Sequence, residues 1–469
     1  MIAEHKRWLA LYMLCAGELM IVLDTTIVNV ALPSIQGDLA FGETALVWVV
    51  NAYMLTYGGF LLLGGRLGDL YGQRRLFLVG ITLFTAASLA CGIGGSQSLL
   101  IVARAVQGLG GAVVSAIALS LIMNIFTDTA DRAKAMGIYG FVCAGGGSLG
   151  VLLGGLLTSA FSWHWVFLVN LPIGAAVYVC CVKLLARDRM PLDRQRLDVW
   201  GAVTVTVSLL LAVYAIVDGN TAGWTSAQTV TLLGAAVALF ALFLVIEART
   251  SHALMPLGLF RLRSVAVANA IGVLWAAAMF AWFFISALYL QLVLGYDPMQ
   301  VGLAFLPANL IMAVFSIGLS AKLVMRFGLR LPIFGGMLLA AMGLALFALS
   351  PVNGSFALHV LPGMLLLGLG CGMALNPVML AAMNDVDPSE SGLASGVVNT
   401  AFMMGGALGL AVLASIAAAR TQGLQGMEPA AALTAGYRVA FALGAVFAAL
   451  AALLAALLPA RRQGVEYAG

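Results

Sequence analysis

The stretch from Leu9 to Pro33, LALYMLCAGELMIVLDTTIVNVALP, constrains the fold more than any other part of the chain. It is predominantly apolar and has the length, about 20 residues, that an α-helix needs to cross a bilayer, and we expect it to end at the proline. It nevertheless carries two acids, Glu18 and Asp24. A carboxylate inside a membrane helix costs on the order of 3 kcal/mol, so it normally faces a protein-lined interior. At about 100° per residue the two acids point roughly 120° apart, so one can reach a partner helix and the other a central cavity.

The composition extends this conclusion to the whole chain. Of the 469 residues, 62% are hydrophobic and 9% are charged, and apolar stretches recur along the entire length. Such a chain is typical of a multi-spanning helical membrane protein, because membrane barrels show short alternating segments instead. We therefore predict an all-α polytopic fold with fourteen spans. They are 9–32, 45–65, 76–95, 99–124, 136–159, 165–185, 199–217, 227–247, 264–293, 299–321, 331–350, 356–381, 391–418 and 436–458.

The longest polar interruption, Ala186 to Asp198, is interpreted as a linker. It divides the chain into a predicted N-terminal six-helix bundle (1–185), a linker with an inserted helix pair (186–263) and a C-terminal six-helix bundle (264–469). Most Lys and Arg residues lie in cytoplasmic segments if both termini are cytoplasmic, so the positive-inside rule predicts that orientation in the cell (inner) membrane. A twelve-span alternative without the pair 199–247 keeps the same orientation, but the length of these two segments favours true membrane helices.

Two segments with similar sequences indicate an internal duplication. Gly65 to Arg75, GRLGDLYGQRR, joins the second and third spans, and Ala321 to Arg330, AKLVMRFGLR, holds the equivalent place in the second half. Gly72 and Gly328 match, and basic residues flank each of them. We expect the first segment to be a loop whose glycines permit tight turning and whose arginines lie at the anionic inner face. Paired halves with a site between them are a common transporter plan.

The motifs together resemble those of a known family. GRLGDLYGQRR resembles the loop motif of the major facilitator superfamily, and LDTTIVNVALP at Leu23 to Pro33 resembles the first-helix signature of its fourteen-span drug:proton antiporter (DHA2-like) branch. Arg104 with Gln107 is similar to the fourth-helix motif, and SWHWVFLVNLPIG at Ser162 to Gly174 resembles the start of the sixth helix. The resemblance covers essentially the whole chain. It implies a membrane transporter that works by alternating access.

The resemblance also implies a gate at the cytoplasmic side. Asp69 is its central residue, because topogenic charge alone does not explain an acid at this position. Its candidate partner is the helix predicted to start near Pro388, where Asp387 and Glu390 fit the pattern of a helix cap. An acid docked on that positive helix end would hold the two halves together. The gating residues implied by the resemblance are Gly65, Asp69, Gly72, Arg74 and Arg75.

Proton coupling is assigned to Glu18, Asp24 and Arg104. Asp24 and Arg104 lie at a similar depth, roughly 8 Å below the outer surface at 1.5 Å per residue, so we predict that they interact. Their pairing could be static or part of the transport cycle. Glu18 lies deeper, near the midplane, where low dielectric favours the neutral form of an acid and permits proton exchange near neutral pH. A hydrogen-bonded structural acid is the alternative role for Glu18.

The fifth predicted span is rich in glycine. Gly146, Gly150 and Gly154 recur every four residues and line one helix face, with Gly155 beside them, so we predict close contact with a neighbouring helix. This pattern resembles the antiporter motif of that helix, but Val151 replaces its usual proline. Because proline would bend the helix, valine should leave it straighter.

Polar and aromatic residues in or near the spans are candidates for a substrate cavity. The four histidines are scattered and form no metal-ligand or nucleophile–base spacing, so we expect no metal, no cofactor and no enzymatic activity. The cavity candidates are Asn51, Tyr57, Gln107, Trp282, Tyr289, Gln291, Asn309, Asn376 and Asn399.

The function predicted from the sequence is proton-coupled export of small amphipathic compounds, as in multidrug efflux. The expected partners are a small-molecule substrate, protons and the lipid bilayer, with no nucleic acid, and a monomer is expected. One alternative keeps the class but changes the cargo to a specific metabolite, lipid or peptide, exported or imported. A non-transporting sensor and a membrane enzyme are the others.

Overall fold

The computed structural model describes residues 4–126, 128–185, 198–250, 253–315, 319–383, 386, 391–424 and 426–458, and the regular structure within these ranges is entirely helical. The first-half helices are α1 (Glu4–Leu39), α2 (Val47–Tyr71), α3 (Gln73–Ile93), α4 (Gln97–Ile125), α5 (Thr129–Ala160), α6 (Trp165–Leu168) and α7 (Asn170–Leu184). The middle pair is α8 (Val199–Ala222) and α9 (Ala227–Arg249). The remaining elements are η1 (Leu257–Arg261), α10 (Arg263–Leu288), η2 (Tyr289–Val293), α11 (Pro298–Val314), α12 (Ser320–Phe327), α13 (Arg330–Ala348), η4 (Phe356–Val360), α14 (Leu361–Met383), α15 (Ser391–Gln422) and α16 (Pro429–Ala455).

The all-helical, multi-spanning prediction is confirmed. Within the described ranges, twelve helices are long and apolar enough to cross a membrane. The other two predicted spans contain shorter apolar helices, Leu149–Ala160 at the end of α5 and Pro298–Val314 in α11. The pair α8 and α9 is among the twelve, as their length predicted.

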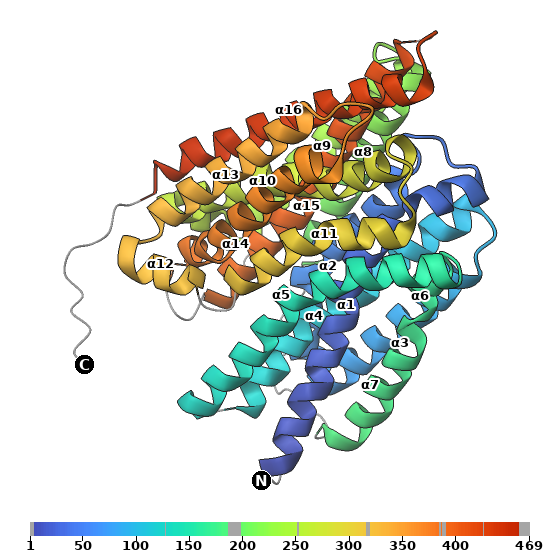
Figure 1. Cartoon of the computed structure of the whole chain (residues 1–469). Coiled ribbons are helices and arrows are strands. Elements are labelled where there is room, and N and C mark those ends of the chain that lie inside the picture. The colour runs from blue at the N-terminus through green and yellow to red at the C-terminus, as the bar shows by residue number, and fades with distance from the viewer. Residues whose placement is uncertain are drawn as a thin grey trace.

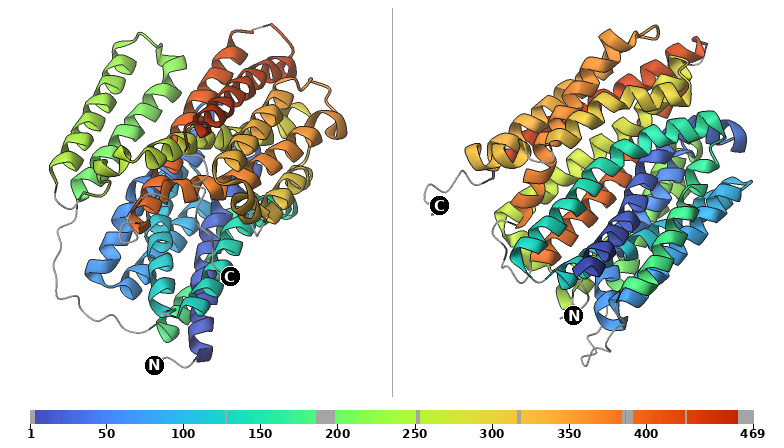
Figure 2. Two further views of the ribbon diagram at one scale, coloured as in Figure 1. Left: turned by 90° about the vertical axis from the view of Figure 1, so that its left-hand side faces the viewer. Right: turned by 60° about the horizontal axis from the view of Figure 1, so that its bottom comes forward.

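The helices form two groups that meet at a shared interface. Helices α1–α7, blue to green, occupy one side of the molecule, and α10–α16, yellow to red, occupy the other (Figure 1). The green helices α8 and α9 pack on each other at the edge of the molecule (Figure 2). Contacts between the two sides are made chiefly by α2 with α15 and by α5 with α11, while α8 contacts both α2 and α15.

The prediction that the first helix ends at Pro33 is wrong. Helix α1 continues through the proline to Leu39. Proline removes one backbone donor from the helix, and tertiary contacts hold the following turn in place. The Nε1 of Trp163 donates to the Oδ2 of Asp38 over 2.9 Å, and the Nε2 of Gln97 donates to the carbonyl of Leu39 over 2.9 Å.

The predicted loop Gly65–Arg75 is mostly helical. Helix α2 runs through Tyr71, and α3 begins at Gln73, so a single residue, Gly72, makes the turn with φ of 96°. That left-handed conformation is one that favours glycine. Its predicted counterpart Gly328, with φ of 74°, separates α12 from α13 together with Leu329, so both matched glycines make a turn at positive φ. Gly65 itself lies inside α2, with Ala116 of α4 nearest to it, so it does not make a turn.

The predicted glycine face of α5 packs against α1. Cβ atoms added to Gly146 and Gly150 would lie 2.9 Å from Val22 and 2.8 Å from the carbonyl of Leu23, respectively. Gly154 approaches the backbone of α1 one turn further on, at Ile27, and Gly155 approaches Pro298 of α11. The predicted close contact is therefore confirmed. Helix α5 is continuous through the buried Val151, in keeping with the absence of proline.

Replacing Gly150 by alanine is expected to lower stability by about 1–3 kcal/mol, because the new methyl group would overlap Thr26 and the backbone of α1. Gly147 provides the matched control on the same helix, since its added Cβ would be 3.8 Å from the nearest atom, a methyl carbon of Thr26. Gly147→Ala should be neutral or slightly stabilising. Thermal unfolding of the two purified variants measures the difference, and equal unfolding temperatures would contradict the close approach of α5 to α1.

Candidate functional site

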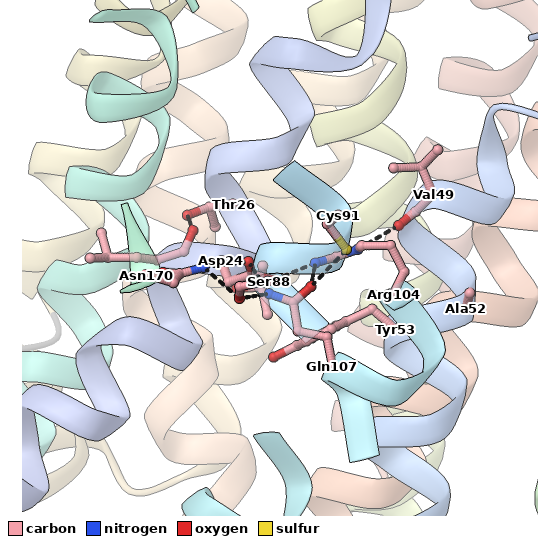
Figure 3. A network of polar contacts seen from close by, with 12 residues as sticks. Asp24, Thr26, Val49, Ala52, Tyr53, Ser88, Cys91, Arg104, Gln107 and Asn170 are labelled. Atoms are coloured by element: carbon pink, nitrogen blue, oxygen red, sulfur yellow. Dashed lines mark hydrogen bonds and ion pairs between the residues drawn. The ribbon is translucent and has the colours of Figure 1, made fainter. Parts of the chain in front are cut away.

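A buried polar network surrounds Asp24, which lies just past the middle of α1 (Figure 3). Arg104 of α4 forms an ion pair with the Oδ2 of Asp24. The Oδ1 of Asp24 accepts hydrogen bonds from Gln107 of α4 over 2.7 Å and from Asn170 of α7 over 3.0 Å. The exposed fraction is 0% for Asp24 and 1% for Arg104. The predicted Asp24–Arg104 pairing is therefore present, and two amides complete it.

The remaining contacts extend the network to α2 and α3. The Nε of Arg104 donates to the carbonyl of Val49 over 2.9 Å, and its guanidinium carbon lies 4.4 Å from the ring centre of Tyr53. Gln107 accepts from Arg104 over 2.7 Å and donates to the hydroxyl of Ser88 over 2.8 Å. The network thus connects α1, α2, α3, α4 and α7.

This network satisfies a charge pair that would otherwise be costly. A buried ion pair is tolerated when additional hydrogen bonds engage its remaining polar atoms, and removing one partner leaves an uncompensated charge. Ser88 and Asn170 were not identified from the sequence. Asn170 lies within the quoted motif Ser162 to Gly174, and Ser88 is a small polar residue in an apolar stretch, but only the fold shows that both belong to the network around Asp24.

Glu18 has different surroundings from Asp24. It is 4% exposed, and its Oε2 is buried without a hydrogen-bond partner in the described part of the chain. The side chains beside its carboxyl group are Ser115 of α4 and Tyr139 of α5, and Tyr57 of α2 lies within electrostatic range. No ion pair to Glu18 is found among the described side chains.

The two acids of α1 therefore differ in the kind of site that they form. Asp24 is paired with Arg104 and two amides, whereas Glu18 lies among hydroxyl groups that accommodate either the carboxylate or the carboxylic acid. The first arrangement is suited to fixing the positions of five helices. The second is suited to binding and releasing a proton without breaking an ion pair.

The gating segment is described only in part. Arg74 donates from its Nη2 to the carbonyl of Val182 on α7 over 2.7 Å, which joins the turn at Gly72 to the end of that helix. The side chain of Asp69 and the predicted cap at 387–390 lie outside the described residues. The predicted contact between them remains a prediction.

The predicted cavity residues serve several different purposes. Gln107 belongs to the Asp24 network, where each atom of its amide is bonded, so the prediction that it lines a cavity is replaced by this role. Asn51 and Gln291 join the two sides by donating to the carbonyls of Ala407 and Val30, each over 2.9 Å.

The other six cavity candidates are spread over several helices. They are Tyr57, stacked on Tyr53; Trp282, packed on Phe283 and Phe305; Tyr289, donating to the carbonyl of Pro351 over 2.7 Å; Asn399, donating to its own helix at Ser395 over 3.0 Å; Asn309, buried with its Nδ2 unpartnered among the described residues; and Asn376, exposed.

A cavity of about 390 Å³ lies between α2, α8, α9, α10 and α15. None of the nine predicted cavity residues lines it, and neither do the acids of α1. Its walls are mainly apolar, with Leu209, Phe240 and Met404 among them. We refer to it as the five-helix cavity. Across the described part of the chain, no three His, Cys, Asp or Glu side chains gather as a metal site.

Comparison with known proteins places this architecture in a family of transporters. The sequence model described as "Major Facilitator Superfamily" matches residues 14–410. The chain is 39% identical to the puromycin resistance protein pur8 of Streptomyces alboniger, over 99% of this chain and 94% of that protein. It is 38% identical to the cephamycin export protein CmcT of Amycolatopsis lactamdurans, over 96% of this chain and 92% of that protein.

The fold agrees with this assignment. The crystal structure of an auto-inhibited POT family peptide transporter superimposes with a TM-score of 0.68, covering 98% of each chain at 18% identity. The chain belongs to the Major Facilitator Superfamily.

Proposed function

We propose that this protein is a proton-coupled exporter of small amphipathic compounds, of the multidrug type, that works by alternating access. The observation that carries the proposal is the full-length similarity to proteins named for puromycin resistance and cephamycin export. The buried acids of α1 support proton coupling, because an intramembrane acid marks an ion or proton pathway by default. Because the family consists of transporters, we propose that the protein has no enzymatic activity.

The proposed architecture is the fourteen-span plan. Helices α5 and α11, added to the twelve longer apolar helices, give fourteen spans. The two bundles comprise residues 1–185 and 264–469, and the linker and inserted pair at 186–263 lie between them in the sequence. The helix contacts support this division, since α1–α7 and α10–α16 pack mainly among themselves. We further propose a monomer in the inner membrane with both termini cytoplasmic.

Contacts between the two sides support a state that is closed at the outer face. The backbone N–H of Met299 at the start of α11 donates to Ser159 at the end of α5 over 3.0 Å. Gln291 donates to Val30 of α1, and Asn51 joins α2 to α15. All three contacts lie toward the end of the molecule where α1 terminates, which is the outer end in the proposed topology. Export requires these contacts to break when the path for the substrate between the two sides opens at the outer face.

The proposed function is tested by flux in proteoliposomes with an imposed pH gradient. Puromycin is the first cargo to try, because one relative carries its name. We expect puromycin to move against the direction of proton flow and a protonophore to abolish its accumulation. Movement in the same direction as protons would indicate an importer. Proton-dependent flux of a metabolite, lipid or peptide alone would change the cargo, and no flux of any compound would favour a sensor.

Asp69→Asn is expected to reduce transport at least about tenfold while leaving the unfolding temperature nearly unchanged. The amide keeps the size of the side chain but removes the charge that is proposed to dock on the helix beginning near residue 388. The control is Asp218→Asn, which removes an acid near the C-terminal end of α8, and this variant should transport normally. Normal flux by Asp69→Asn would exclude the proposed contact from the transport cycle.

A further inference from the structure

The five-helix cavity has an acidic end that the proposed coupling mechanism does not use. Glu247 of α9 lines the cavity and is 3% exposed. Its Oε2 accepts a hydrogen bond from the N–H of Met255 over 3.0 Å, and the backbone of Leu254 also interacts with the carboxyl group, but its Oε1 has no hydrogen-bond partner among the described residues. A buried carboxylate oxygen without a partner is costly, so a ligand that supplies a donor would be bound favourably.

A second carboxyl group converges on the same point. Asp198 caps α8 by accepting from the N–H of Gly201 over 2.9 Å, and its other oxygen, Oδ2, is also buried without a partner in the described structure. A Cβ atom on Gly201 would lie 2.7 Å from both the free oxygen of Asp198 and the free oxygen of Glu247. Glycine at this position therefore leaves the two carboxyl groups close together, and both Gly201 and Glu247 line the cavity.

The other unpartnered groups of the cavity fit the same kind of ligand. Asn269 donates its Nδ2 to Val265, which leaves its Oδ1 as an unpartnered acceptor, and the hydroxyl of Thr400 is unpartnered in the described structure as well. Both residues line the cavity, and the described residues that line it include no Lys, Arg or His. The free polar atoms are thus acceptors or hydroxyl groups, which favours a cationic hydrogen-bond donor over an anion.

The shape and lining of the cavity indicate that the cationic ligand also has an apolar part. Glu247 lies in the last turn of α9, close to where α8 begins, at the end that faces the cytoplasm in the proposed topology. From there the lining continues along the helices to Leu209, Phe240 and Leu408. A volume of about 390 Å³ is within the range of small-molecule sites. The acidic end therefore lies at headgroup depth, and the apolar part lies in the adjoining half of the bilayer.

We infer that the five-helix cavity binds an amphipathic amine, with its ammonium group at Glu247 and Asp198 and its apolar body between the helix pair α8–α9 and α15. The site is formed by the inserted pair together with both halves of the transporter, because α2, α10 and α15 supply the rest of its wall. Its binding chemistry follows from the side chains alone. Its placement in the inner leaflet rests on the proposed orientation.

The test is equilibrium binding to the full chain in lipid nanodiscs, with no gradient, so that it does not depend on transport. The probes are 4-phenylbutan-1-ol, which is neutral, and 4-phenylbutylamine, which has the same apolar body and a primary ammonium group with three N–H donors. After subtraction of binding to empty nanodiscs, we expect the cationic probe to bind at least about tenfold more tightly, as a charge-assisted contact provides. Equal binding of the two probes would overturn the inference and favour a proton shared by the two acids.

Variants locate the site. Glu247→Gln should remove the preference for the cationic probe and leave binding of the neutral probe unchanged. Asp198→Asn, which retains a capping residue, should weaken the preference as well. Asp218→Asn at the far end of α8 is the control and should behave as wild type. Ala270→Trp, which fills the cavity, should reduce binding of both probes. A wild-type preference in both Glu247→Gln and Asp198→Asn would refute the assignment.

The membrane composition identifies the source of the amine. Phosphatidylglycerol has no amine in its headgroup, so in bilayers of this lipid only the added probe can supply an amine to the site. If added phosphatidylethanolamine displaces the cationic probe from wild type, the resident ligand is a lipid amine of the inner leaflet. If the probe remains bound, the site takes foreign single-chain amines.

Discussion

Arg104→Leu is expected to lower the stability of the protein by about 3–5 kcal/mol and to abolish transport. The substitution leaves Asp24 completely buried without its counter-charge, with only the amides of Gln107 and Asn170 to support it. It also breaks the bond to the carbonyl of Val49 and so loosens α2 from α4. Thermal unfolding of purified protein and flux in proteoliposomes measure the two effects.

Arg438→Leu is the matched control, because Arg438 is an exposed arginine that makes one bond of 2.8 Å to the carbonyl of Ala348. It should cost far less than Arg104→Leu. The double variant Asp24→Asn with Arg104→Leu should recover part of the lost stability, because it removes the unpaired charge. Strictly additive losses in the double-mutant cycle would show that the two side chains do not interact in the membrane.

Glu18→Gln is expected to abolish transport driven by a pH gradient while preserving the fold. Glutamine has the size of the protonated acid but cannot lose a proton, so it fixes one of the two states that coupling requires. The surroundings of Glu18, with Ser115 and Tyr139 beside it, accommodate an amide. Binding of cargo should persist in this variant. Flux with and without the gradient, compared with wild type, gives the result.

The control for Glu18→Gln is Glu43→Gln, an exposed acid in the connection between α1 and α2. It should retain gradient-driven flux. If Glu18→Gln also retains wild-type flux with the same pH dependence, then Glu18 is a structural acid. Proton binding would then have to involve Asp24, and the pairing with Arg104 would have to open during the cycle.

The sequence by itself determined those features that depend on one helix. The length and hydrophobicity of each apolar stretch predicted the helices, because a bilayer fixes both quantities. Spacing along α5 predicted the glycine face, since residues four apart lie on one side of a helix. Equal depth of Asp24 and Arg104 was enough to predict their ion pair, because a buried charge in a membrane needs a partner.

Only the tertiary structure decided which helices are neighbours. Ser88 and Asn170 lie in apolar stretches on separate helices, and their convergence on Asp24 depends on how α3 and α7 pack against α1. Contacts of α1 with other parts of the chain also stabilise the helical turn that follows Pro33, although proline disfavours a helix interior. Glu247 was overlooked because it lies near a helix end, where charge is ordinary. Its buried, unpartnered oxygen arises from the packing of α8 and α9 against α2, α10 and α15, and no single helix encodes that arrangement.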